Sequence, residues 1–190
     1  HWLGKQLDTA AAMSHIPADD FKLSASRALT WRQSLAEAAR KDPAMFAQYV
    51  IRDERTSKGI RLAPMHKIWH ELFSKYDRLV LWSAVSAGKT TMISIGRVLW
   101  EIGNDPTIRI LVLSNTHGQA VKIINTIATY IQHSPEYKEV FPEIKPSDRE
   151  EPWKPLSGQL TVARPTMSKD PTVTAAGVRG NILGARYDLI

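Results

Sequence analysis

At 190 residues the chain is long enough to bury one substantial core, so a single domain is the default expectation. Its net charge of +6 favours polyanionic partners, and the absence of cysteine excludes disulfides and thiolate metal sites. No apolar run approaches the ~20 residues of a membrane span, and the first residues, His-Trp-Leu-Gly-Lys, carry no signal-peptide pattern.

The first segment, residues 1–42, is predicted to be a helical lead-in. Apolar residues recur at helical spacing from Ser24 to Lys41, and the pair Asp42-Pro43 is expected to end this helix. The remaining residues, 43–190, are predicted to form the main domain.

Three segments lead from this helix to the first predicted strand. Met45 to Ile51 is expected to be a short helix, and Arg52 to Gly59 a polar turn. Pro64 to Lys75 is predicted to be a helix because its apolar residues fall on one helical face. These apolar residues are Met65, Ile68, Trp69 and Phe73.

The pattern then changes to alternating strands and helices. Leu79 to Trp82 is a continuous apolar run, typical of a strand covered on both faces. Thr90 to Ile102 is predicted to be a helix that Gly103 stops. A second buried strand is expected over Ile108 to Leu113, followed by a helix over Gly118 to Gln132.

Shorter elements are expected in the last third of the chain. Pro135 to Pro155 is predicted to be loop or short helix, while Leu160 to Ala163 and Thr172 to Ala176 read as short strands that can form a hairpin. Asn181 to Arg186 is expected to turn, and Tyr187 to Ile190 to begin another strand. This order predicts an α/β domain with a largely parallel central sheet flanked by helices.

Residues 83–91, Ser-Ala-Val-Ser-Ala-Gly-Lys-Thr-Thr, lie between the predicted strand and helix, where a phosphate-binding loop is found. Gly88 lets the backbone approach phosphate, and Lys89 is the expected contact of the β- and γ-phosphates. Thr90 is the expected Mg²⁺ ligand, and Thr91 can hydrogen-bond a phosphate. The predicted nucleotide-binding residues of this loop are Ser83, Ser86, Ala87, Gly88, Lys89, Thr90 and Thr91.

The match to the usual pattern is incomplete, because Ser83 stands where the first glycine is expected. A serine fits that place if its φ angle is negative. The alternative reading is an ordinary turn from strand to helix that contains an incidental Gly-Lys-Thr.

Three stretches, in this order and spacing, resemble the ATPase domain of the large terminase subunit of tailed bacteriophages. They are Leu62–Trp69 (Leu-Ala-Pro-Met-His-Lys-Ile-Trp), Ser86–Thr91 (Ser-Ala-Gly-Lys-Thr-Thr), and Ala175–Gly180 continued by Ile182–Ile190. The third is the most discriminating, and the resemblance covers roughly residues 43–190. It implies a P-loop NTPase fold.

The resemblance also implies a function. Members of this family bind ATP and Mg²⁺ and hydrolyse ATP to drive double-stranded DNA into a preformed capsid, in the cytoplasm of an infected bacterial host. The implied partners are DNA, the portal protein, the small terminase subunit and further copies in a ring. The acids of the expected acidic strand lie beyond Ile190, as does the family's nuclease domain, and Asp188 is interpreted as a strand-start residue.

Three further site residues follow from the resemblance. His66 lies where related translocases place an adenine-reading glutamine, and the alternative is a partly buried helix histidine. Arg179 and Arg186 are expected to join Lys89 in a catalytic set by sensing or stabilising phosphate charge, and the alternative is a surface role. Thr116 is predicted to cap the following helix.

Two other classes of protein stay open on the sequence. One is another P-loop enzyme, either a helicase-like translocase or a small-molecule kinase. A kinase needs a base, an acceptor pocket and a lid, and the polar stretch 135–155 has no paired acid and base. The other is a binding module with a degenerate nucleotide site.

Overall fold

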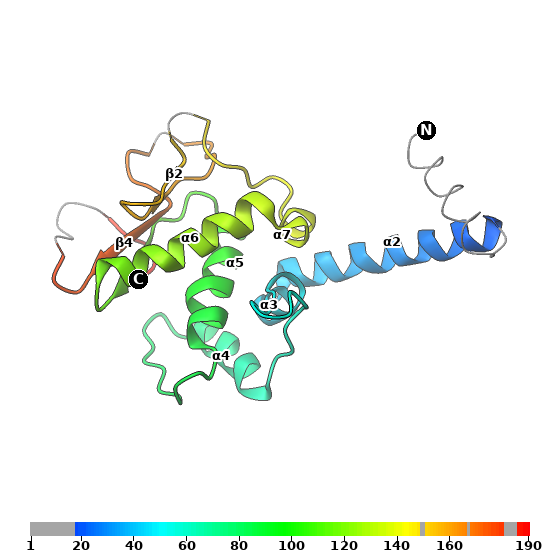
Figure 1. Cartoon of the computed structure of the whole chain (residues 1–190), viewed down its shortest axis with the longest axis horizontal. Helices are drawn as coiled ribbons and strands as arrows, with labels where there is room; N and C mark the ends of the chain where they lie inside the picture. The colour runs from blue at the N-terminus through cyan, green and yellow to red at the C-terminus, as the bar shows by residue number, and fades with distance from the viewer. Residues whose placement is uncertain (1–17, 149–150, 167, 181–185) are drawn as a thin grey trace.

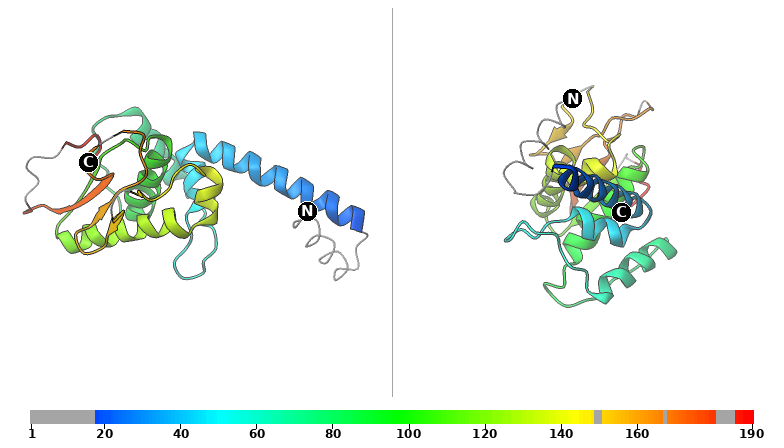
Figure 2. Two further views of the ribbon diagram at one scale, coloured as in Figure 1. Left: turned by 90° about the horizontal axis from the view of Figure 1, so that it is seen from above. Right: turned by 90° about the vertical axis from the view of Figure 1, so that its right-hand side faces the viewer.

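The computed structural model describes residues 18–148, 151–166, 168–180 and 186–190. It is a mixed α/β structure in which helices flank a four-stranded sheet. Helix α2 (Ala18–Lys41) begins before the predicted Ser24 and ends at Lys41, as predicted. Its amino-terminal part extends away from the rest of the molecule (Figures 1 and 2). None of the described helices combines the length and apolar character needed to cross a membrane.

Asp42 and Pro43 link α2 to the next helix, α3 (Pro43–Val50). The carboxylate of Asp42 accepts hydrogen bonds from the backbone N–H groups of Ala44 (2.7 Å) and Met45 (3.2 Å). Pro43 takes the first helical position, where no N–H group needs a partner. The pair therefore ends one helix, as predicted, and also starts the next.

The polar turn expected over residues 52–59 is confirmed. Arg52 and Gly59 form an antiparallel bridge, and the backbone N–H of Ser57 donates to Asp53 O at 2.8 Å. Helix α4 (Pro64–Lys75) then has the bounds that the sequence predicted. It packs against α3, and its buried residues are Trp69 and His70.

The predicted strand Leu79–Trp82 is not formed. Within the described part of the chain its backbone makes no hydrogen bond to another strand. Leu81 packs against the core, but Val80 and Trp82 are 80% and 91% exposed. The side chains alternate between partly buried and exposed, as in an extended chain. No described strand lies beside this segment to pair with its backbone.

The helix predicted over residues 90–102 is confirmed, with a difference in its geometry. It starts as a π-helix, η1 (Thr90–Arg97), and continues without a break as α5 (Val98–Asn104). Gly103 does not stop it, because the helix ends after Asn104 and before Pro106. π-Helical turns are rare and are often found at functional sites.

The sheet has the strand order β1-β4-β3-β2. Strand β1 (Ile110–Ser114) pairs in parallel with β4 (Val173–Gly177). Strand β3 (Gln159–Leu160) is antiparallel to β4 and to β2 (Trp153–Lys154). The predicted largely parallel sheet is therefore wrong, since β1 with β4 is the one parallel pairing among the described strands. The short connection from β2 to β3 permits only an antiparallel pair.

Helix α6 (His117–His133) packs on β1, β3 and β4. Thr116 caps it as predicted, because its hydroxyl accepts the Gln119 N–H at 3.3 Å. Of the strand expected over residues 187–190, Leu189 alone forms a parallel bridge, with Ile110. The turn predicted over 181–186 lies outside the described residues, apart from Arg186.

An aromatic cluster connects α3 to α7 (Pro135–Val140) and to Phe141, which follows α7. Phe46 of α3 packs against Tyr137 of α7 and against Phe141, with ring centroids 6.0 and 5.7 Å away. Tyr137 donates its hydroxyl proton to Leu99 O at 3.2 Å, which satisfies this buried polar group. The segment Pro135 to Pro155, predicted to be loop or short helix, thus contains α7 and the strand β2.

Candidate functional site

The loop at residues 83–89 runs from the extended segment Leu79–Trp82 to the start of η1. The φ angle is positive at Ser86 (63°) and at Gly88 (83°), but not at Ala87 between them. At Lys89 it is −49°. Such an alternation turns successive backbone N–H groups toward one side, and the concave result suits an anion.

Most of the N–H groups of this loop have no hydrogen-bond acceptor in the described part of the chain. The N–H of Ala87 donates to Ala84 O at 3.4 Å and closes a turn. The N–H groups of Val85, Ser86 and Gly88 donate to no acceptor among the described residues. These groups are therefore available to a ligand that accepts hydrogen bonds.

Glycine is favoured at position 88 because of the backbone conformation there, and not because a side chain would lack space. A Cβ atom there would lie 3.6 Å from the nearest atom, His66 Nε2, which is ordinary contact distance. The positive φ angle is the feature that side chains rarely tolerate.

The side chain of Lys89 folds back across the loop. Its Nζ donates to Ser83 O (2.9 Å), to Ser83 Oγ (3.1 Å) and to Ala84 O (2.8 Å). The ammonium group thus meets three oxygen atoms at the mouth of the loop, where a phosphate would offer the same kind of atom.

Two hydroxyl groups follow the lysine. Thr90 is exposed and Thr91 is half-buried, and neither side chain makes a hydrogen bond within the described residues. Magnesium prefers oxygen ligands and keeps several waters, so an exposed hydroxyl beside the predicted phosphate contacts fits this ion. Thr90 is the residue that would hold it.

His66, in the first turn of α4, contacts the loop directly. Its Nδ1 accepts the Ala63 N–H at 3.2 Å, so a neutral ring carries its proton on Nε2. Nε2 lies 2.9 Å from Ala87 O and donates to it. The ring also packs on Trp69, with centroids 5.0 Å apart. The predicted adenine contact of His66 stays a prediction, and in this conformation both ring nitrogens already have partners.

The two predicted phosphate-sensing arginines are exposed. Arg179 follows β4 in a turn closed by a hydrogen bond from Gly180 N–H to Gly177 O at 2.7 Å. The Val178 N–H donates to Ser114 O, which holds this turn at the carboxyl end of β1. Neither Arg179 nor Arg186 forms an ion pair or a side-chain hydrogen bond with a described residue. Their role stays a prediction.

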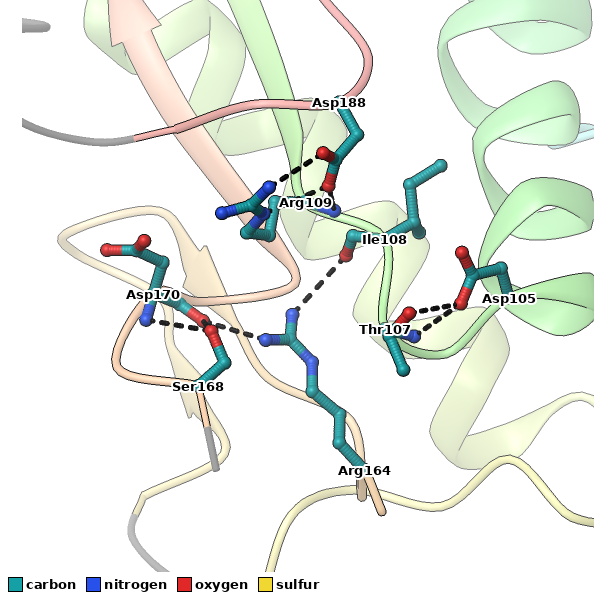
Figure 3. A network of polar contacts seen from close by, with 8 residues as sticks. All are labelled: Asp105, Thr107, Ile108, Arg109, Arg164, Ser168, Asp170 and Asp188. Carbon is teal, nitrogen blue, oxygen red and sulfur yellow. Dashed lines mark hydrogen bonds and ion pairs between the residues drawn. The ribbon is translucent and has the colours of Figure 1, made fainter. Parts of the chain in front are cut away.

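Asp188 lies at the opposite, amino end of β1 and is paired with Arg109 (Figure 3). The guanidinium donates to both carboxylate oxygens, at 2.7 and 2.9 Å, and the Arg109 N–H adds a third bond at 3.0 Å. These hydrogen bonds hold the pKa of Asp188 below its usual range. This geometry is that of a structural ion pair at the amino end of β1, whereas the last strand, in which Asp188 was expected to be an early residue, forms only the Leu189 bridge within the described residues.

Arg164 occupies the centre of the same network and was not singled out in the sequence (Figure 3). It donates to Pro106 O, Ile108 O and Asp170 O, and to the hydroxyl of Thr172. Burial lowers its pKa. No sequence pattern marks an arginine whose partners are mostly backbone carbonyl groups from distant parts of the chain.

Comparison with protein-family models, with curated proteins and with solved structures finds no match to this chain.

Proposed function

We propose that this chain is the ATP-binding and ATP-hydrolysing part of a DNA-packaging motor of the large-terminase kind, built on a P-loop NTPase fold. The observation that carries the proposal is the loop at residues 83–91. It combines alternating φ angles and a lysine at its mouth with N–H groups, and a hydroxyl at the start of the next helix, that have no hydrogen-bond partner in the described part of the chain. The more specific proposal of a packaging motor rests on the resemblance of the sequence to large terminase subunits.

The residues have distinct roles in this proposal. The N–H groups of Val85, Ser86 and Gly88 hydrogen-bond phosphate oxygens, and Lys89 turns from the loop carbonyls to the outer phosphates. The hydroxyl of Thr90 holds the metal ion. Bound Mg-ATP supplies the phosphoanhydride bond whose hydrolysis drives the motor.

Partners and location rest on the resemblance and on charge. The net charge of +6 suits double-stranded DNA, and any phosphate contact should weaken as salt rises. Arg179 and Arg186, which are exposed, are proposed to approach the phosphates bound by a neighbouring copy in a ring. The portal protein, the small terminase subunit and the cytoplasm of an infected bacterium belong to the same proposal.

The first experiment is a calorimetric titration with Mg-ATP of the wild type, Lys89→Ala and Lys58→Ala. Lys58 lies exposed in the polar turn at residues 52–59, so its replacement controls for the loss of one positive charge. Binding that Lys89→Ala abolishes and Lys58→Ala retains supports the proposal. Equal binding by all three proteins, or no binding by the wild type, contradicts it.

Turnover separates the motor from its alternatives. ATP hydrolysis that double-stranded DNA stimulates, and that added salt suppresses, supports a translocase. Phosphoryl transfer to a small acceptor indicates a kinase. Turnover is measured on a chain that includes the acidic strand expected beyond Ile190, and saturable binding by that chain without turnover in the presence of DNA indicates a binding module.

A further inference from the structure

The ammonium group of Lys89 is fully occupied by the loop itself. An ammonium group has three N–H donors, and here they meet three oxygen atoms at 2.8 to 3.1 Å. All three acceptors belong to Ser83 and Ala84, which precede the unused N–H groups in the chain. The lysine therefore bridges the mouth of the loop.

One of these acceptors depends on the side chain at position 83. Two are backbone carbonyl groups, which any residue would provide, but the third is the Ser83 hydroxyl. The usual motif has glycine at this place and so has no such acceptor. The same hydroxyl points its own proton toward Ala84 O at 3.5 Å, which leaves its lone pairs to Lys89.

We infer that Ser83 is a positioning residue that holds Lys89 in a closed state in the nucleotide-free protein. This rests on the proposed function, because it makes phosphate the competitor of the Ser83 hydroxyl for the same N–H group. A ligand must break the contact before Lys89 can turn toward it. Removing the hydroxyl weakens the closed state and leaves the loop backbone unchanged.

The first test measures Mg-ATP affinity by calorimetry for the wild type, Ser83→Ala and Ser83→Thr. The net strength of one hydrogen bond predicts about 3- to 10-fold tighter binding by Ser83→Ala. Ser83→Thr keeps a hydroxyl and is expected to bind like the wild type. Equal affinity of all three, or weaker binding by Ser83→Ala, overturns the inference, since weaker binding would mean that the hydroxyl contacts the nucleotide instead.

A second test needs no nucleotide. Acylation of lysine Nζ atoms, followed by mass spectrometry, compares Lys89 with exposed Lys58 in the same molecule. We expect slow labelling of Lys89 in the wild type and in Ser83→Thr, and faster labelling in Ser83→Ala. If Lys89 of the wild type is labelled as fast as Lys58, the inference of a closed state is overturned.

The two tests separate the two ideas. If labelling follows the expectation but no protein binds Mg-ATP, the closed lysine stands and the proposed function fails, together with the competition by phosphate. If the wild type binds and Lys89→Ala does not, but Ser83→Ala changes neither affinity nor labelling, the function stands and the role of Ser83 fails.

Discussion

The ring of Phe141 lies directly against the backbone of Gly103. A Cβ atom at position 103 would be 2.3 Å from two ring carbons, well inside contact distance. Phe141 is fully buried and packs against Phe46 and Tyr137, so its ring cannot move aside without disturbing them. The glycine thus provides the space in which this aromatic cluster closes on α5.

We therefore expect Gly103→Ala to destabilise the protein, although alanine favours helices. Overpacking of a core costs about 1–3 kcal/mol. Gly118→Ala is the control, because a Cβ atom there would have no neighbour within 4 Å, and the same change in an open helix is worth up to about +1 kcal/mol. Urea unfolding of both variants checks this. A Gly103→Ala variant as stable as Gly118→Ala would contradict it.

Replacement of Gly88 should act through backbone conformation. The φ angle of 83° is unfavourable for alanine by about 1–2 kcal/mol, whereas asparagine tolerates this region better. We expect Mg-ATP affinity to fall in the order wild type, Gly88→Asn, Gly88→Ala, as measured by calorimetry. A Cβ atom at position 88 has room, so neither variant is affected by a steric clash there. Unchanged binding by Gly88→Ala would therefore show that nucleotide binding does not need this loop conformation.

His70 of α4 is a buried histidine. It is 1% exposed, and neither ring nitrogen has a partner among the described residues. An unsatisfied buried polar group costs about 1–3 kcal/mol, so His70→Leu should raise the free energy of unfolding by roughly that order. His70→Asn is the control, because it keeps a polar group at this position and should bring no such gain. A loss of stability in His70→Leu would contradict the prediction.

The same residue predicts a pH dependence. Burial, helped by the positive charge of Arg97, lowers the pKa of His70 from 6.5 to about 4. The unfolded chain therefore binds a proton below pH 6.5 that the folded protein does not bind. Stability is full above that pH and falls until the pKa of the folded state is reached.

From pH 7.5 to pH 5 this loss amounts to about 2 kcal/mol. Urea unfolding at both pH values should show it in the wild type and not in His70→Leu, whose other histidines are the same. An equal pH dependence of the two proteins would contradict the assignment to His70.

Asp42 offers a test of the junction between α2 and α3. Its carboxylate caps α3 through Ala44 and Met45, and loss of such a cap costs about 1 kcal/mol. Thermal unfolding should therefore show Asp42→Ala to be less stable than the wild type. Asp42→Asn keeps an acceptor oxygen and should lie close to the wild type, so equal losses in both variants would exclude the cap as the cause.

Helices were the part of the fold that the sequence predicted well. The bounds of α4 matched, α2 ended where Asp42-Pro43 indicated, and Thr116 capped α6. Periodicity and capping depend on residues within a few positions of one another, so a single sequence contains them.

The sheet was predicted less well, because strands depend on distant partners. Leu79–Trp82 has the composition of a buried strand, yet within the described chain nothing pairs with it and Trp82 is exposed. Strands β2 and β3 have two residues each, too few to show an alternating pattern. Because β3 pairs antiparallel with both β2 and β4, the sheet is mostly antiparallel and not largely parallel as predicted.

The loop could be located from the sequence, but its internal contacts could not. The Gly-Lys-Thr pattern identifies which residues lie there, while the closed position of Lys89 depends on the fold of the five residues between Ser83 and Lys89. The contact of His66 with Ala87 joins two elements whose relative position no local pattern specifies.

The contacts of His66 with Ala87 and of Lys89 with Ser83 also bear on the order of the loop before any ligand arrives. Because they fix the backbone from two sides, most of the conformational entropy of the loop is lost when the protein folds and not when it binds. Association then exchanges one set of hydrogen bonds for another and orders little new chain. We expect the heat capacity change of Mg-ATP binding to be small. We expect the association rate to be limited by the rate at which Lys89 dissociates from Ser83 and Ala84.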